Sequence, residues 1–362
     1  MLRMKPGDTV ALLNTYSQRT YDRITGTLQS AGLKVITGKS FWLFSSPTTD
    51  VVPEDELAEL LKRADAAFCS GGRRRLNLTR RVLESTGRLR GVTTASIGAD
   101  NIDIPAATEA GILVANSPVP GNYNNVVQHA VALALALVKR FSYYSDFVRK
   151  GEPNWELFAL PDALPIYLDS SKTLGVVGFG RIGSRVAKVF REFDMRVLAY
   201  DPYVSDERAE LLGVKMVDSL DELLRESDIV SIHTFLSEGT THLIGRRELG
   251  LMKKDAFIVN TSRGNIIDEA ALIEALRTHA IAGAGLDVTE VEPVEPDNPL
   301  LKMPNVIVTP HIAGASEALF TQGTDYAVEN IIRMLRGDAP KSLLNPEALP
   351  KWREKFALRQ GS

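Results

Sequence analysis

The segment Leu174-Gly-Val-Val-Gly-Phe-Gly-Arg-Ile-Gly183 has the pattern of a buried strand, a glycine-rich turn and the beginning of a helix. A G-x-G-x-x-G spacing alone is a weak signal, but here an apolar strand pattern precedes it. The next predicted strand, Arg196–Tyr200, leads into Asp201, at the distance where an acidic residue accepts hydrogen bonds from a ribose. Together these features predict a dinucleotide-binding site in the middle of the chain.

Each residue of the turn has an expected part in that site. Gly178 permits the tight turn, Gly180 lets the backbone approach a pyrophosphate, and Gly183 lets helix and strand pack closely. Arg181 and Ile182 open the helix, whose unbonded N–H groups and positive dipole end face the phosphates.

Asp201 indicates which cofactor the site prefers. Its carboxylate accepts both ribose hydroxyls and repels a 2′-phosphate, so we expect NAD rather than NADP. The alternative is that Asp201 is only a turn residue at the end of a strand, since Pro202 follows it.

The composition is that of an ordinary globular protein. At 362 residues, with 44% apolar and 24% charged residues, the chain is long enough for two domains. The net charge of -3 favours neither a nucleic-acid partner nor a membrane surface. A single cysteine, Cys69, excludes an intramolecular disulfide and a cysteine-based metal site. The longest apolar stretch, Ala130–Val138, is shorter than a bilayer span, so we expect a cytoplasmic protein. We expect no bound metal.

Strand and helix patterns alternate in two series along the chain, which predicts two parallel sheets covered by helices on both faces. The strand patterns of the first series are Thr9–Leu13, Lys34–Thr37, Ala66–Cys69, Val92–Ala95 and Ile112–Ala115. Those of the second series are Leu174–Gly178, Arg196–Tyr200, Ile229–His233, Ala256–Thr261, Gly283–Val288 and Val306–Thr309.

Four segments outside these strands need separate interpretations. Residues Gly38–Pro47 follow neither period and predict a loop. Residues Asn116–Gly121 have the composition of a linker, and Asn124–Arg149 predicts one helix that is apolar on more than one face. A last helix pattern spans Glu317–Arg336, with Gly337 as its stop signal. No strand follows it, so this helix must pack on a domain already built.

The simplest account is an α/β fold of two Rossmann-like parallel-sheet domains. Residues 1–116 and 315–362, from both ends of the chain, form a flavodoxin-like domain that we assign to the substrate. Residues 117–314 form an inserted NAD-binding Rossmann domain.

Three strand ends of the second series carry complementary chemistry. Hydride transfer from a C–OH group needs a base for the hydroxyl proton and a cation for a neighbouring carboxylate. One strand leads into Arg263, the next into Asp287 and then Glu292, and the last into His311. Because ligands bind at the carboxyl ends of parallel strands, we expect a cation, a carboxylate and an imidazole at one rim.

The other histidines fit other places. We expect His129 to be packed within the apolar helix and His279 to end a helix. His233 ends a strand that lines the adenosine region, and His242 looks like a surface residue at a helix start.

At these strand ends the sequence resembles the NAD-dependent D-2-hydroxyacid dehydrogenases. The motifs that carry the resemblance are Gly98-Ala-Asp-Asn-Ile-Asp103, Val259-Asn-Thr-Ser-Arg-Gly264, Gly285-Leu-Asp-Val-Thr-Glu-Val-Glu-Pro293 and Asn305-Val-Ile-Val-Thr-Pro-His-Ile-Ala-Gly314. The resemblance covers about residues 90 to 345. It implies an enzyme that moves a hydride between NAD(H) and a small D-2-hydroxy acid or its 2-oxo acid, and a homodimer built on the cofactor domain.

The resemblance also implies roles for single residues. Arg263 would hold the substrate carboxylate and carbonyl, and His311 would be the general acid and base. Glu292 would orient His311 and raise its pKa by favouring imidazolium. The cofactor contacts would come from Thr261, Ser262, Asp287 and Gly314, with Asp287 at the nicotinamide carboxamide. Substrate contacts would come from backbone N–H groups at Ile97 and Gly98.

Alternatives remain for several of these residues. Arg263 could cap backbone carbonyls, Glu292 could be a solvated turn residue with Glu290 in its place, and His311 could be an ordinary loop histidine. The cluster Arg73, Arg74 and Arg75 either binds a second anionic group of the substrate or is a solvated basic loop. Phe235 departs from the family, which usually has a proline near the adenine.

Two other functions compete with a general 2-hydroxyacid dehydrogenase. One is an NAD(H)-sensing binding protein, like the corepressors related to these enzymes, although the chain lacks basic tails. The other is a short-type 3-phosphoglycerate dehydrogenase.

Overall fold

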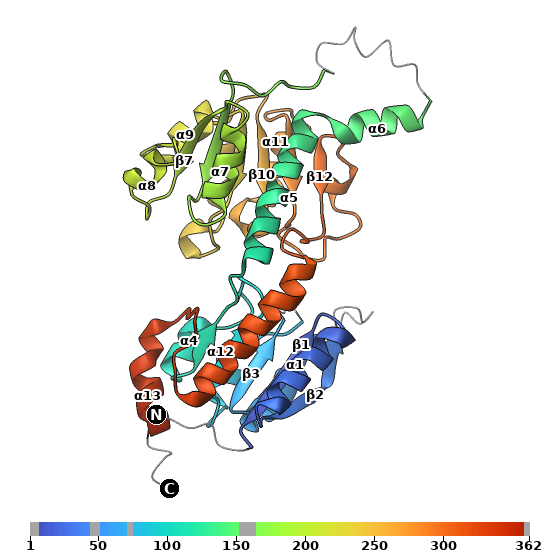
Figure 1. The fold of residues 1–362 in the computed structure, drawn as a ribbon. Helices are drawn as coiled ribbons and strands as arrows, with labels where there is room; N and C mark the ends of the chain where they lie inside the picture. The colour runs from blue at the N-terminus through green and yellow to red at the C-terminus, as the bar shows by residue number, and fades with distance from the viewer. Residues whose placement is uncertain (1–6, 44–50, 71–74, 152–163, 358–362) are drawn as a thin grey trace. The chain divides into compact units, whose positions relative to one another are not determined.

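The computed structural model describes residues 7–43, 51–70, 75–151 and 164–357. The chain divides into two units, of which unit 1 comprises Met1–Asn122 and Ala315–Ser362, and unit 2 comprises Tyr123–Gly314 (Figure 1). The boundary between them falls at 122/123, where the linker composition suggested 116/117. The predicted α/β fold with two parallel sheets is confirmed.

Unit 1 contains a five-stranded parallel sheet with strand order β2-β1-β3-β4-β5, which is the flavodoxin-like order. Its strands are β1 (Thr9–Thr15), β2 (Lys34–Leu43), β3 (Ala66–Cys69), β4 (Gly91–Thr94) and β5 (Leu113–Ala115). All seven residues of β1 are buried, as expected for a strand covered on both faces.

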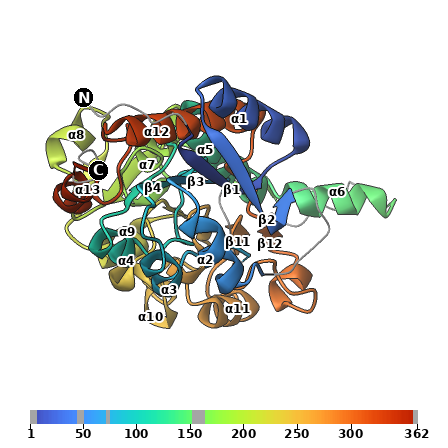
Figure 2. The ribbon, with the colours of Figure 1, turned by 90° about the horizontal axis from the view of Figure 1, so that it is seen from below.

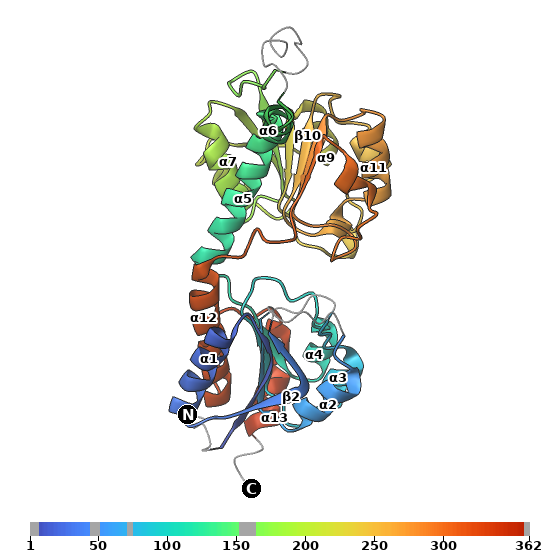
Figure 3. The ribbon, with the colours of Figure 1, turned by 90° about the vertical axis from the view of Figure 1, so that its right-hand side faces the viewer.

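Helices cover both faces of this sheet, and Figures 2 and 3 show α1 and α12 on one face and α2, α3 and α4 on the other. The helices of unit 1 are α1 (Gln18–Ser30), α2 (Glu54–Lys62), α3 (Arg80–Glu84), α4 (Ile104–Glu109), α12 (Thr324–Arg336) and α13 (Leu349–Ala357). One core joins Val10, Leu12 and Phe68 to α1, α12 and α13, and the alternate residues Ala11 and Leu13 join the core under α2, α3 and α4. The last predicted helix therefore does return to the first sheet, preceded by a π-turn at Leu319–Gly323.

Unit 2 contains a seven-stranded parallel sheet with strand order β12-β11-β10-β9-β6-β7-β8. Its strands are β6 (Thr173–Val177), β7 (Arg196–Tyr200), β8 (Lys215–Met216), β9 (Ile229–Ile232), β10 (Phe257–Asn260), β11 (Gly283–Leu286) and β12 (Val306–Val308). The chain runs outward from β6 through β7 on one side and through β9 on the other. The carboxyl ends of β6 and β9 therefore form the switch point where open α/β sheets bind their ligands.

Helix α5 (Pro120–Val138) begins in unit 1 and continues into unit 2 from Tyr123. The other helices of unit 2 are α6 (Phe141–Arg149), α7 (Gly183–Arg191), α8 (Asp206–Glu210), α9 (Leu220–Glu226), α10 (Arg246–Leu249) and α11 (Glu269–Arg277). Residues of α5 and α7 share one core with the sheet, and residues of α9, α10 and α11 share the core on its other face.

The predicted loop at Gly38–Pro47 is wrong over its first part, because β2 continues to Leu43. The pairing of β1 with β2 shifts register between Leu12 and Asn14, after which Asn14 faces Trp42. This bulge breaks the alternation by which a strand is recognised in a sequence. Residues 44–47 lie outside the described residues.

The single helix predicted over Asn124–Arg149 is also wrong, because α5 ends at Val138 and α6 begins at Phe141. Arg140, between them, adopts a left-handed backbone with φ 53°. Such a turn usually has glycine or asparagine, so an arginine gave no signal. The start also differs, since Pro120 and Gly121 of the expected linker form the first turn of α5.

Over the described ranges, no helix combines the length and the apolar character needed to cross a bilayer.

Candidate active site

The turn from β6 to α7 needs its glycines for different reasons. Gly178 has φ 90°, and a Cβ there would lie 2.7 Å from the backbone nitrogen of Thr234. A Cβ at Gly183 would lie 2.1 Å from the carbonyl oxygen of Gly178, so no side chain fits between turn and helix. A Cβ at Gly180 would meet nothing within 4 Å. The space over Gly180 therefore stays open to a group outside the chain, which fits the pyrophosphate of a dinucleotide.

Asp201 connects this turn to the end of β7. One of its carboxylate oxygens accepts a hydrogen bond from Phe179 N at 2.8 Å, and the other accepts one from Tyr203 N at 2.9 Å. Asp201 thus helps to hold this turn, and its predicted contact with the ribose stays a prediction. A carboxylate has about four acceptor positions, so these two bonds leave acceptor capacity for ribose hydroxyls.

Two buried polar atoms lie where the neighbouring strands end. Within the described part of the chain, neither Thr261 Oγ1, after β10, nor His233 Nδ1, after β9, has a hydrogen-bond partner. His233 Nε2 lies 2.8 Å from Ser231 Oγ, and burial lowers the pKa of His233 to about 3. A buried polar atom without a hydrogen-bond partner lowers the stability of the folded protein. The position of His233 at the switch point, and of Thr261 at the next strand end, fits the binding of a polar cofactor.

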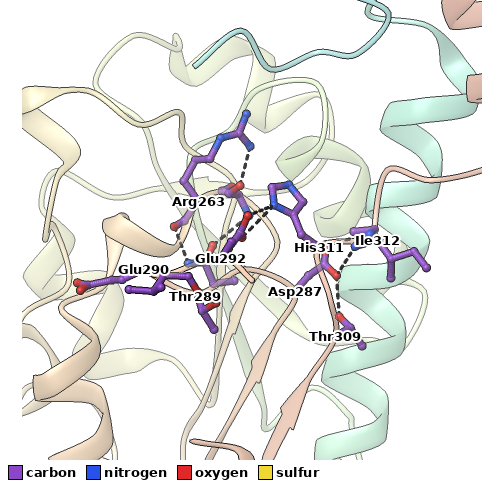
Figure 4. Close-up of polar contacts among 12 residues, drawn as sticks. Arg263, Asp287, Thr289, Glu290, Glu292, Thr309, His311 and Ile312 are labelled. Carbon is purple, nitrogen blue, oxygen red and sulfur yellow. Dashed lines mark hydrogen bonds and ion pairs between the residues drawn. The ribbon is translucent and has the colours of Figure 1, made fainter. Parts of the chain in front are cut away.

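The register of the sheet brings three functional segments to one edge. Asn260 of β10 faces Leu286 of β11, and Leu286 faces Val308 of β12. The three strands therefore end level, and the segments that follow them begin side by side. Figure 4 shows Arg263, Glu292 and His311 extending from this edge.

The imidazole and its carboxylate partner are in direct contact. His311 Nδ1 lies 2.9 Å from both carboxylate oxygens of Glu292. Both side chains are largely buried, with exposed fractions of 18% and 20%. His311 has φ 52°, a backbone that costs a residue other than glycine about 1 kcal/mol or more. Backbone strain at a residue with a titratable side chain is typical of functional sites.

Glu290, the competing carboxylate, points away from His311 (Figure 4). Its Oε1 lies 2.7 Å from His242 Nε2 and accepts a hydrogen bond from Glu269 N at 3.2 Å. His242 is half exposed and precedes no helix directly, since α10 begins only at Arg246. The structure thus separates two acid–imidazole pairs, Glu292 with His311 and Glu290 with His242.

Asp287 lies beneath the His311 segment. Its side chain has no exposed area, and it accepts hydrogen bonds from Thr309 Oγ1 at 2.7 Å and from Ile312 N and Ala313 N at 2.8 Å each. The predicted contact between Asp287 and the nicotinamide carboxamide stays a prediction. The structure shows that Asp287 holds the backbone directly after His311 and the Thr309 side chain before it.

Arg263 is held at the end of β10. Its Nη1 donates to Ser262 O at 2.7 Å, and Asn260 Nδ2 donates to Arg263 O at 2.9 Å. Ser262 is fixed in turn, because its hydroxyl donates to Ile232 O of β9. Arg263 as a residue is half-buried.

His129 is not simply packed in its helix, as the sequence suggested. Its Nε2 lies 2.9 Å from Thr309 Oγ1, two residues before His311. One turn earlier on α5, Asn125 Nδ2 donates to Ala313 O at 2.8 Å. Polar residues four apart share one helix face. That spacing of polar residues in the first half of α5 was the available signal.

The expected substrate residues of unit 1 follow its own strand ends. Ile97 and Gly98 lie in the segment after β4, where Asn116 Nδ2 donates to Ile97 O at 2.8 Å. Arg75 is described and its carbonyl accepts from Val52 N. Arg73 and Arg74 lie outside the described residues.

Comparison with protein families matches residues 131–313 to the NAD-binding domain of D-isomer specific 2-hydroxyacid dehydrogenases. The chain belongs to this family. It therefore has the NAD-binding, Rossmann-like domain of an oxidoreductase family, and NAD is its cofactor. The matched range contains all the residues of unit 2 discussed above except Tyr123–Ala130 and Gly314.

Characterised relatives differ in length from this chain. It is 39% identical over 298 residues to a D-3-phosphoglycerate dehydrogenase of Methanocaldococcus jannaschii, covering 82% of this chain but 55% of that one. It is 42% identical over 268 residues to a glyoxylate reductase of Korarchaeum cryptofilum, covering 74% of this chain and 80% of that one. The chain thus spans about half the length of this phosphoglycerate dehydrogenase and most of the length of this glyoxylate reductase.

The fold matches solved structures over nearly the whole chain. A D-lactate dehydrogenase of Aquifex aeolicus, solved with NAD and lactic acid, is 32% identical with a TM-score of 0.77. The match covers 92% of this chain and 99% of that one. The family's two-sheet architecture therefore extends to unit 1, where the family model itself does not match.

Proposed function

We propose that this protein reduces a small 2-oxo acid to its D-2-hydroxy acid with NADH, or catalyses the reverse oxidation. The contact between His311 and Glu292, beside Arg263 at the carboxyl ends of three adjacent strands, carries the proposal. NAD, when bound, supplies the hydride donor or acceptor. The residues of the chain then have to handle one proton and one carboxylate.

His311 is proposed as the acid and base. Because Nδ1 is held by Glu292, Nε2 is the nitrogen that would face the substrate oxygen. In reduction the hydride adds to C2 of the oxo acid while imidazolium gives its Nε2 proton to the carbonyl oxygen, forming the hydroxyl. Glu292 offsets the positive charge that the ring carries before this transfer, so the pair favours the protonated acid.

Arg263 is proposed to bind the substrate. A guanidinium presents a planar pair of N–H donors that matches a carboxylate, and part of Arg263 is accessible. Bound in this way, the carboxylate fixes the position of C2 next to it. Orientation of this kind can lower a barrier by several kcal/mol. We assign unit 1, with Ile97 and Gly98, to the substrate as well, and the roles of Arg73, Arg74 and Arg75 stay predictions.

The decisive experiment is a substrate panel. Purified protein with NADH should reduce glyoxylate or hydroxypyruvate, and chiral analysis of the product from hydroxypyruvate should give the D isomer. His311→Ala should lower kcat by about 10²–10⁴-fold. If the protein binds NADH but reduces no acid in the panel, a dinucleotide-sensing role is favoured instead.

The relatives named D-3-phosphoglycerate dehydrogenase and glyoxylate reductase support two substrate classes. Including 3-phosphohydroxypyruvate in the same panel separates them. A kcat/KM higher for the phosphorylated acid than for hydroxypyruvate would favour a short-type phosphoglycerate dehydrogenase. The reverse order would favour a reductase of small 2-oxo acids.

We also propose that the protein is a homodimer and, as its sequence suggests, cytoplasmic. Helix α6 has no buried residue and exposes Phe141, Tyr143 and Val148, with exposed fractions of 62%, 41% and 71%. Figure 1 shows α6 extending away from the sheet of unit 2. An exposed apolar helix of this kind is typical of a subunit contact.

A further inference from the structure

A second imidazole, that of His129, contacts the segment that carries His311. His129 of α5 contacts Thr309 Oγ1 through Nε2 at 2.9 Å, and Thr309 Oγ1 lies 2.7 Å from Asp287. His129 Nε2 is also 3.5 Å from the same carboxylate oxygen. The three side chains therefore form a line from α5 to the end of β11, passing through the segment that follows β12.

The direction of each hydrogen bond in this line follows from the groups themselves. A carboxylate can only accept, so the single proton of the Thr309 hydroxyl points to Asp287. The hydroxyl oxygen can then only accept a hydrogen bond from His129, so His129 must donate from Nε2. The line thus requires the His129 tautomer that carries its proton on Nε2.

The line ends on the backbone that holds His311. Asp287 accepts from Ile312 N and Ala313 N, directly after His311, and Thr309 O accepts from His311 N at 2.9 Å. His311 itself has the left-handed φ of 52°. Such a conformation persists only when its surroundings fix it. Here the donors and acceptors on both sides of the residue do so.

We propose that His129 is a positioning residue, which fixes the direction of the His311 ring by holding Thr309 and Asp287 in place. The inference rests on the proposed function of His311. His129 touches neither substrate nor cofactor in this scheme. Its loss should therefore change the rate of the chemical step and leave the binding of both ligands nearly unchanged.

The test compares two replacements of His129. His129→Phe keeps the volume of the ring but removes the donor, whereas His129→Gln places an amide N–H near the position of Nε2. We expect His129→Phe to lower kcat about 5- to 30-fold, with KM for the oxo acid and Kd for NADH within about threefold of the wild type. His129→Gln should recover most of this loss. Equal losses in both variants, or an unchanged kcat in His129→Phe, would overturn the inference.

Replacements of Thr309 test the same inference independently. Thr309→Val should reproduce the loss seen in His129→Phe, Thr309→Ser should not, and the double variant His129→Phe with Thr309→Val should be no slower than either alone. Additive losses would mean that the two residues act separately. Circular dichroism and the melting temperature identify any variant that fails to fold. If one variant fails to fold, the decision rests on the other pair, either His129→Phe against His129→Gln or Thr309→Val against Thr309→Ser.

The tautomer can be read without any turnover. With ¹⁵N-labelled histidine, a long-range ¹H–¹⁵N spectrum contains only five imidazoles, and His129→Gln assigns one of them. The signal of His129 should be that of the Nε2–H form. The Nδ1–H form would contradict the inference even if the enzyme is active. A wild type that turns over no acid, with the Nε2–H form present, would instead sink the proposed function.

Discussion

At the scale of single residues, the structure decides questions that the sequence left open. Glu292 and Glu290 are two residues apart and equally acidic, but only the orientation of the chain after β11 shows which one contacts His311. Asp287 was expected at the cofactor, which stays a prediction, and the structure shows that its carboxylate also accepts from two backbone N–H groups and the Thr309 hydroxyl. A motif gives residue types at given positions, and it does not give the direction of a side chain.

Arg263 allows a sharp test of carboxylate binding. Arg263→Lys keeps the charge but loses the planar pair of donors, so kcat/KM for the oxo acid should fall about 10- to 100-fold. Steady-state kinetics with NADH at saturation measures this. The control is Arg277→Lys on α11, where an exposed guanidinium pairs with Glu274 and no effect is expected. A kcat/KM that survives Arg263→Lys would leave Arg263 as a structural cation.

His233 should make stability depend on pH. Burial lowers its folded-state pKa to about 3, against 6.5 for the free side chain, so below pH 6.5 only the unfolded chain gains this proton. The contribution is complete above pH 6.5 and is lost as the pH falls from there toward 3, by up to about 1.4 kcal/mol per pH unit. Urea unfolding of the protein without NAD, at pH 7 and pH 5, should show a larger decrease for the wild type than for His233→Gln.

The exposed His279 supplies the matched control for that measurement. His279→Gln should keep the wild-type decrease between the two pH values. If His233→Gln and His279→Gln give the same decrease as the wild type, another group causes the pH dependence.

At the scale of secondary-structure elements, prediction succeeded where local residues decide the outcome. The turn between β6 and α7 depends on backbone space at Gly178 and Gly183, which only glycine provides, so the sequence pattern sufficed. Prediction failed where contacts between residues far apart in the sequence determine the structure. The bulge opposite Asn14 extends β2 to Leu43, and Arg140 ends α5 without a glycine or proline. The contact of His129 with Thr309 likewise depends on how α5 lies against β12.

The end of β7 is the element that should select the cofactor. Asp201→Asn removes the charge while keeping one acceptor oxygen for the turn, so the repulsion of a 2′-phosphate disappears. The ratio of kcat/KM for NADH to that for NADPH should exceed about tenfold in the wild type and shrink by about tenfold in the variant. Initial rates with each cofactor measure it. Equal use of both cofactors by the wild type would contradict the role of Asp201.

At the scale of the whole molecule, the chain builds two units, each around one parallel sheet. Unit 2 is one continuous stretch of chain that carries the family's NAD-binding domain and the proposed acid–base pair. Unit 1 comes from both ends of the chain, and the same strand-and-helix rhythm gives it a five-stranded sheet. Each unit has two apolar cores, one on each face of its sheet.

The assembly of two copies can be tested on α6. At 100° per residue Phe141 and Val148 lie on one side of this helix, and Ser142 lies about 100° around the helix from Phe141, outside that apolar side. Phe141→Glu with Val148→Glu should convert a dimer to a monomer in sedimentation experiments, because charges cannot be buried in an apolar contact. Ser142→Glu should leave the mass unchanged. A wild type that sediments as a monomer would refute the homodimer.

The helix that returns to unit 1 has a consequence for synthesis on the ribosome. Val10, Leu12 and Phe68 emerge early, but α12, which covers them, comes only after the whole of unit 2. During that interval α1 can cover only part of this side of the nascent sheet, and the part that α12 covers is an exposed apolar surface of the kind through which chains aggregate. We therefore expect this surface to be protected during synthesis, by chaperones or by rapid completion of translation, until the inserted domain has been made.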